Sequence, residues 1–162
     1  MKMSGIFTCV SRYNALRSML LVGSILLIGS AANILSGQVF ISGGSNVNGP
    51  YTTLAAAVTA LNGATISGAV VVDVDAGHTE VLTSRINLTA TGTSTNTINI
   101  QKSGAGANPL LISYAGTNTP SSAERDGMFS ITGSDWVSIT AINLQENVAN
   151  TTETTCMEYG YG

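Results

Sequence analysis

Charged residues are scarce in this sequence, and basic residues are the scarcest. Only 9% of the 162 residues are charged, whereas 44% are hydrophobic. That balance gives the chain enough apolar surface to fold, so a disordered polyelectrolyte is excluded. Three of the six Lys and Arg residues precede residue 20, which leaves three positive against nine negative charges, a net of −6, after residue 37. Nucleic acid is therefore excluded as a partner, because phosphate binding depends on Lys and Arg.

Cysteine and histidine are almost absent. Cys9 and Cys156 are the two cysteines, and His78 is the single histidine. Cys9 falls in a segment that we expect to be removed, so Cys156 is left without a disulfide partner and is predicted to be a small apolar core residue. A catalytic Cys156–His78 pair has no local signature in its favour. His78 is predicted to be an exposed corner residue, since a metal site would need further ligands.

The first 37 residues have the three parts of a secretory signal peptide. Three basic residues precede an apolar run over 19–28, and small residues follow that run. Cleavage is expected after Gly37, with Ala32 as the alternative. The apolar run is shorter than the roughly 20 residues that a membrane span needs, so no stable span is expected after cleavage. The sequence thus predicts a secreted or cell-surface protein.

One amphipathic helix is predicted in the remaining chain, over residues 52–63. Its apolar residues recur at i, i+3, i+4 and i+7, which places them on one face; they are Leu54, Ala57, Val58 and Leu61. Thr52 or Thr53 can cap the start of this helix. Gly63 suits a left-handed residue after its last turn.

Short strands are predicted everywhere else, separated by Gly, Asn, Ser and Thr. β-branched residues alternate with polar ones in most of them, the pattern of a half-buried strand. After the short apolar segment Val39–Ile41, they are Ala69–Val74, Arg85–Leu88, Thr97–Gln101, Leu110–Ser113, Met128–Thr132, Trp136–Thr140 and Ala141–Gln145. No helical period recurs between them, which disfavours a βαβ sheet.

These strands could form a sandwich or a solenoid. A sandwich joins consecutive strands through tight hairpin turns, and Asp126-Gly127 is the one candidate of that kind between the predicted strands. Strands of three to five residues instead suit the sides of a coil. We therefore predict an all-β fold, a right-handed parallel β-helix with the amphipathic helix as its N-terminal cap. Its coils are expected to begin near Val70, Ile98, Met128 and Cys156.

Three domains follow from this interpretation. They are a signal peptide over 1–37, a strand and capping helix over 38–66, and the first coils over 67–162. We expect the solenoid to be truncated at its C-terminus, because a coil ending at Gly162 would leave its apolar end uncovered. The remainder of its own solenoid is then an expected partner.

Three stretches resemble a known family. They are PYTTLAAAV at 50–58, VVVDVDAGHTE at 70–80 and DGMFSITGSDWVSI at 126–139. These are similar to the pectin-lyase-like β-helical surface proteins of bacteria that use type IX secretion, although Ala141 stands where that family usually has Gly or Asp. The resemblance implies a bacterial secreted or cell-surface protein with an adhesive or carbohydrate-related role.

Asp73, Asp75 and Trp136 are the candidate ligand contacts. Asp73 and Asp75 lie two apart on a predicted strand and so share a face, where they could bind Ca²⁺ or a sugar. The competing interpretation is an ordinary exposed face, with Val70, Val72 and Val74 pointing inward. Trp136, like Tyr114, could stack on a sugar ring, but packing is the more usual role of a large aromatic side chain. No other cofactor or metal is predicted.

Two functions are carried forward. The first is a non-catalytic surface or secreted protein, an adhesin or structural stalk that binds polysaccharide or cell-surface glycan. The alternative is the N-terminal part of a polysaccharide lyase or glycoside hydrolase whose catalytic coils lie beyond residue 162. The sequence favours the first, because Arg85, Lys102 and Arg125 form no cluster and no convergent polar site is evident.

Overall fold

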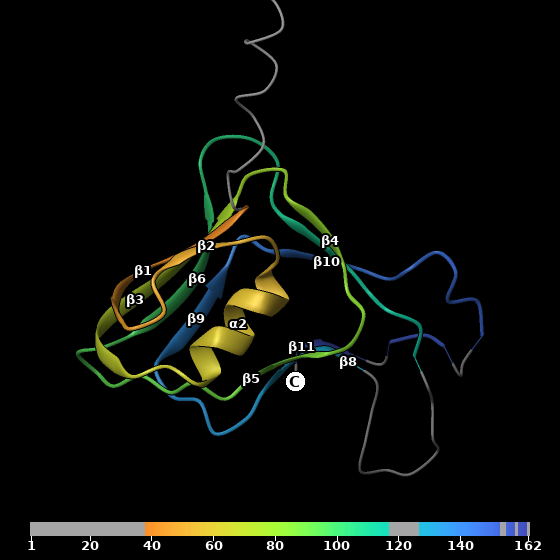
Figure 1. Cartoon of the computed structure of the whole chain (residues 1–162). Helices are drawn as coiled ribbons and strands as arrows, with labels where there is room; N and C mark the ends of the chain where they lie inside the picture. The colour runs from red at the N-terminus through yellow and green to blue at the C-terminus, as the bar shows by residue number, and fades with distance from the viewer. Residues whose placement is uncertain (1–37, 117–126, 153–154, 158, 162) are drawn as a thin grey trace, which may run out of the picture. The chain divides into compact units, whose positions relative to one another are not determined.

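The computed structural model describes residues 38–116, 127–152, 155–157 and 159–161 (Figure 1). Gly37–Gly162 form one compact unit. The predicted signal peptide lies outside the described residues. Within the described ranges, no helix has the length and apolar character needed to cross a membrane.

Short strands dominate the described part of the chain, as the sequence predicts. In chain order the elements are β1 Val39–Ser45, β2 Gly49–Tyr51, α2 Leu54–Asn62, β3 Ile66–Asp75, β4 Thr79–Val81, β5 Ile86–Leu88, β6 Ile98–Ser103, β7 Leu110–Ile112, β8 Gly127–Ile131, β9 Val137–Thr140, β10 Asn143–Gln145 and β11 Tyr159–Tyr161. The seven strands predicted between Ala69 and Gln145 coincide with β3 and β5–β10 to within a few residues. β2, β4 and β11 were not predicted.

The strands form three small sheets (Figure 1). Sheet A has the order β2-β1-β3-β6-β9, sheet B the order β10-β7-β4 and sheet C the order β11-β8-β5. From β3 onward consecutive strands fall in different sheets, and each pairs in parallel with the strand three places away. We call β3–β5 the first tier, β6–β8 the second tier and β9–β11 the third tier.

The predicted right-handed parallel β-helix with a capping helix is wrong. The three sheets do not close into a solenoid, and sheet A is mixed, because β1 runs antiparallel to both β2 and β3. The helix α2 has nine residues and is not a long amphipathic cap. The sequence pattern led to the wrong architecture because short alternating strands broken by turn residues are equally compatible with several small sheets. Truncation of a solenoid is overturned with the solenoid.

The predicted phase of the repeat is also wrong. Val70 of β3 is opposite Ile98 of β6, as expected, but the next residue in that register is Val137 of β9. Met128, predicted to begin a third coil, belongs to β8 in sheet C, beside β5. Cys156 lies outside the strands. Register depends on which backbones pair, and irregular loop lengths hide that from the sequence.

The core lies on the inner side of sheet A and continues beneath α2. Val70, Val72 and Val74 of β3 are fully buried, as are Ile98 and Ile100 of β6. Full burial of a Val or Ile side chain contributes roughly 1.5–3 kcal/mol, so this alternation determines which face of the sheet points inward. The partly exposed residues between them form the outer face.

The helix begins and ends close to the predicted residues. Thr53 is its N-cap, with the side-chain hydroxyl accepting a hydrogen bond from the Ala56 amide at 3.1 Å. The four residues of the predicted apolar face are buried. Gly63 follows the helix at φ −96°, so the predicted left-handed conformation is wrong. α2 packs mainly against β5 and β1.

Candidate functional site

One row of side chains crosses all five strands of sheet A. The strand register places Pro50, Phe40, Asp73, Gln101 and Thr140 opposite one another, in sheet order. Phe40 is 46% exposed. The Gln101 Nε2 donates a hydrogen bond to Asp73 Oδ1 at 3.0 Å. Because neighbouring strands lie about 4.8 Å apart, the row is a line of closely spaced groups, apolar at one end and polar at the other.

A second row, polar except for Val71, runs beside the first on the same outer face. It contains Ser42, Val71, Asn99 and Ser138. The Ser138 hydroxyl donates to Asn99 Oδ1 at 2.7 Å. Hydrogen bonds between strands in both rows orient the polar side chains and hold them along the sheet. We call the two rows together the outer face of sheet A.

The two predicted carboxylates lie where the alternation places them. Val70, Val72 and Val74 point inward, while Asp73 is partly exposed and Asp75 is exposed, both on the face of β3 opposite to the valines. Asp73 is bound by Gln101, whereas Asp75 stands at the end of β3, beyond the first row. Asp73 therefore belongs to the outer face of sheet A, with Asp75 at its rim.

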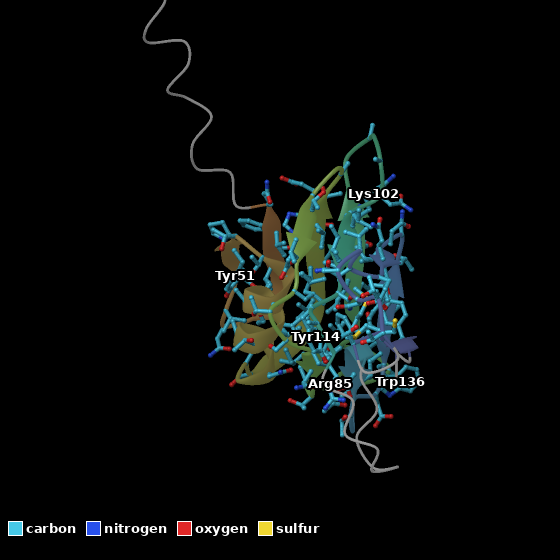
Figure 2. All side chains as sticks on the ribbon, turned by 90° about the vertical axis from the view of Figure 1, so that its right-hand side faces the viewer. Tyr51, Arg85, Lys102, Tyr114 and Trp136 are labelled. Carbon is cyan, nitrogen blue, oxygen red and sulfur yellow. The ribbon has the colours of Figure 1, made fainter. Side chains whose placement is uncertain are left out.

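Trp136 is not packed into the core, contrary to the more usual role expected for it. It is 58% exposed and has φ +58°, a left-handed conformation that non-glycine residues rarely adopt. Its carbonyl accepts a hydrogen bond from the Ile98 amide at 3.0 Å, which ties it to β6 immediately before β9. Figure 2 shows Trp136 and Tyr51 at opposite sides of the molecule, as expected from β9 and β2 being the two edges of sheet A.

Phe40 is a member of this face that the sequence interpretation missed. Val39, Phe40 and Ile41 read together as one short apolar strand. The structure buries Val39 and Ile41 completely and turns Phe40 outward. Strict alternation contained this signal, because a strand with two buried residues two apart must expose the residue between them.

His78 and Glu80 form a polar cluster with Gln38 in which His78 and Glu80 are buried, so the predicted exposed corner position of His78 is wrong. His78 is 4% exposed and Glu80 is 7% exposed. The His78 Nε2 lies 3.3 Å from Glu80 Oε2, and its Nδ1 lies 2.6 Å from Gln38 Oε1. The Glu80 carboxylate also accepts hydrogen bonds from the Leu54 and Ala55 amides, at 2.7 and 3.2 Å.

This cluster joins α2 to β4. The first amides of a helix have no partner within the helix, and the helix dipole favours a negative charge beside them. Glu80 supplies both the acceptors and the charge from a position 25 residues along the chain from Ala55. Its lone pairs are thus engaged by backbone, which makes it a structural carboxylate. Nothing in the sequence around Glu80 predicted this pairing, because it depends on tertiary contact.

A second polar cluster closes the chain after β10. Glu146 Oε1 accepts hydrogen bonds from the Ser113 hydroxyl at 2.8 Å and from the Asn150 amide group, while Oε2 accepts from the Met157 amide at 2.9 Å. Burial by itself raises the pKa of Glu146, but the hydrogen bonds from Asn150, Met157 and Ser113 outweigh it and hold the pKa below its usual value. Glu146 is therefore a charged side chain whose hydrogen bonds hold this loop against the end of β7.

Two further predicted candidates take structural positions. Cys156 is a free, partly buried thiol whose Sγ lies 3.6 Å from the Asn150 carbonyl oxygen. It therefore adjoins the second cluster and is not hydrogen-bonded to His78. The Tyr114 hydroxyl donates to the Gly127 carbonyl at 3.2 Å. Among the described residues, no group of three or more His, Cys, Asp or Glu side chains is placed to hold a metal ion. Calcium binding at Asp73 and Asp75 stays a prediction.

Comparison of the chain with protein-family models, with curated proteins and with solved structures gives no match. The resemblance to the pectin-lyase-like surface proteins therefore stays a prediction, and function has to be argued from the outer face of sheet A.

Proposed function

We propose that this protein is an exported, non-catalytic surface or secreted protein that binds carbohydrate, as an adhesin or structural component, through the outer face of sheet A. The observation that carries the proposal is the row formed by Phe40, Asp73, Gln101 and Thr140. It places an exposed aromatic ring in line with a carboxylate, a carboxamide and a hydroxyl.

The chemistry of this row suits a sugar. A sugar ring has an apolar face of C–H groups and a rim of hydroxyls, so it is recognised by an aromatic ring together with hydrogen-bonding side chains. Asp73 accepts one hydrogen bond from Gln101 among the described residues, and a carboxylate has room for several. Charge also restricts the class of glycan that can bind, because the chain after residue 37 has a net charge of −6 and would repel a polyanion. Neutral glycans are therefore favoured over acidic ones.

Two carboxylates that are engaged by several hydrogen bonds, Glu80 and Glu146, support a non-catalytic role. Acid–base cleavage of glycosidic bonds needs carboxyl groups free to exchange protons with the substrate. Glu80 is engaged by the amides of α2, and Glu146 is engaged by Ser113, Asn150 and the Met157 amide. Both contribute to the fold. Of the two carboxylates on the outer face of sheet A, Asp75 is exposed and Asp73 is partly exposed and bound by Gln101.

Binding to a panel of neutral and acidic polysaccharides tests this proposal. The chain is recovered from the culture medium, where export requires a new N-terminus at Gln38 or, by the alternative cleavage, Asn33. We expect a neutral polysaccharide to bind, and Phe40→Ala and Gln101→Ala each to weaken binding about tenfold, the effect of losing one stacking or hydrogen-bonding contact.

The matched control is Val81→Ala, which removes a side chain that is 59% exposed on sheet B. It should bind like the unchanged protein. Binding that survives both outer-face substitutions, or failure of the whole panel to bind, contradicts the proposed face. New reducing ends or unsaturated products would contradict the non-catalytic role.

A further inference from the structure

The Asp73–Gln101 pair has hydrogen-bonding capacity that the fold does not use. The two residues lie opposite each other on β3 and β6, and both are partly exposed. A single hydrogen bond joins their side chains, from Gln101 Nε2 to Asp73 Oδ1 at 3.0 Å, and within the described ranges neither side chain makes another. The Asp73 carboxylate therefore keeps free acceptor sites, and the Gln101 carboxamide keeps a second N–H and its carbonyl oxygen.

The neighbouring polar pair on the same face is more fully engaged. The Ser138 hydroxyl donates to Asn99 Oδ1 at 2.7 Å, and Asn99 Nδ2 donates to Thr97 Oγ1 at 3.4 Å. Both ends of the Asn99 carboxamide are thus used within the sheet. The Asp73–Gln101 pair differs in offering both an acceptor and a donor to a ligand, already oriented by their mutual hydrogen bond, which lowers the entropy lost on binding.

The spacing of this acceptor and donor matches two hydroxyls on adjacent carbons of a sugar ring. When such a vicinal diol is cis or diequatorial, its two oxygens lie about 3 Å apart, the length of one hydrogen bond. The Asp73 and Gln101 atoms have the same separation, 3.0 Å. One hydroxyl of the diol can therefore donate to the carboxylate while the oxygen of the next accepts from the carboxamide.

An isolated hydroxyl fits the pair less well. To bind both residues at once, it would have to direct its O–H and a lone pair at two atoms only 3.0 Å apart. Those atoms subtend a narrower angle than the tetrahedral angle between an O–H bond and a lone pair, so both hydrogen bonds would be bent and weakened. Two adjacent hydroxyls avoid this strain.

Phe40 completes the contact on the other side of Asp73. It lies opposite Asp73 on β1 and is 46% exposed. Neighbouring strands are about 4.8 Å apart, so the Phe40 ring is one strand spacing from the diol position. The C–H groups of the bound glycan can pack on this ring while the diol faces β3 and β6.

We propose that the Asp73–Gln101 pair binds a vicinal diol, so that the ligand is a neutral glycan whose sugars keep free hydroxyls on adjacent ring carbons. A 1,4-linked glucan or mannan meets this condition, because each internal sugar keeps the hydroxyls on its second and third carbons. A 1,3-linked glucan does not, because its linkage occupies the carbon between its free ring hydroxyls. This inference rests on the proposed carbohydrate function and adds the class of sugar to it.

Affinity electrophoresis of the unchanged protein tests this class. Glucomannan, galactomannan and amylose are used as native polymers and after periodate oxidation and borohydride reduction, which cleave vicinal diols and leave the chain uncharged. The 1,3-linked glucan laminarin is the matched neutral control. We expect at least one native 1,4-linked polymer to bind, its oxidised form to bind about tenfold more weakly or less, and laminarin not to bind.

The outcomes separate this inference from the proposed function. Binding of laminarin as tight as that of the 1,4-linked polymers, or binding that survives oxidation, would overturn the diol and leave a carbohydrate-binding face. No binding to any of these polymers would overturn both.

Exchanging the two side-chain groups tests the pair itself. Asp73→Asn and Gln101→Glu should each weaken binding of the native polymer about tenfold, because the pair then offers two carboxamides or two carboxylates. The double variant restores one acceptor and one donor in reversed order. Since each hydroxyl of a diol can donate or accept, it should recover most of the affinity. Thermal unfolding shows that each variant is folded, and a folded double variant that binds no better than the single ones overturns the proposal.

Discussion

Glu80 has its charge inside the protein, where an isolated carboxylate would be strongly disfavoured. It is 7% exposed and accepts hydrogen bonds from two amides of α2, with His78 close to the same oxygen. Those contacts replace the water that the carboxylate loses. The residue thus links a strand to the start of a helix that precedes it in the chain.

Replacing Glu80 with alanine should destabilise the protein by about 3 kcal/mol, because the buried Leu54 amide and the partly buried Ala55 amide lose their acceptor and the helix loses a charge at its N-terminus. Glu80→Gln should cost less, since one amide oxygen can still accept. Urea unfolding measures both. Thr79→Ala, at the exposed neighbouring position of β4, is the control. Equal stability of Glu80→Ala and Thr79→Ala would show that the cluster does not hold the helix.

His78 and Trp136 show what the sequence could not predict at the residue scale. Each was placed by the usual behaviour of its type: a histidine beside glycine at a corner, and a tryptophan flanking a strand. The structure buries the first and exposes the second, at 4% and 58%. Both outcomes depend on neighbours distant in the chain, Gln38 for His78 and β6 for Trp136.

At the scale of elements, the close pairing of β1 with β3 depends on two glycines, Gly44 and Gly68. A Cβ added at Gly44 would lie 2.2 Å from the Gly68 Cα, so the two backbones approach more closely than any side chain permits. The register of this pair shifts between Gly43 and Ser45, as in a β-bulge. β1 can take its antiparallel position beside β3 only with glycine at this point of close backbone contact.

Gly44→Ala should therefore destabilise the protein by about 3 kcal/mol or more, since a backbone clash cannot be relieved by rotating a side chain. Gly63→Ala is the matched control, because Gly63 has φ −96° and the nearest atom to an added Cβ is 3.8 Å away. It should change stability by only about 0.5 kcal/mol. Thermal unfolding compares the two. If Gly44→Ala is as stable as Gly63→Ala, the close contact between the β1 and β3 backbones is not maintained in solution.

At the scale of the whole molecule, the tiers differ in how deeply their apolar side chains are buried, and therefore in how much those side chains stabilise the fold. Ile100 is fully buried in the second tier, and Ile139, its partner in register, is partly buried in the third. The free energy gained by an apolar side chain follows the area removed from water and the cavity its loss would leave.

Ile100→Ala should cost about 3 kcal/mol and Ile139→Ala about 1 kcal/mol, because the second cavity opens to solvent and can relax. The measurement is urea unfolding. Equal losses would mean that the third tier is as well covered in solution as the second.

The sequence by itself determined the local elements and the inward and outward faces, because alternation, capping and turn residues act over a few neighbouring positions. Phe40, Asp73 and Asp75 lie on the faces that this alternation dictates. Only the tertiary structure decided which strands pair, that β1 runs antiparallel to β3, and that no solenoid closes. It also decided the buried partners of Glu80 and Glu146. Pairing and burial depend on residues tens of positions apart, whose meeting no local pattern specifies.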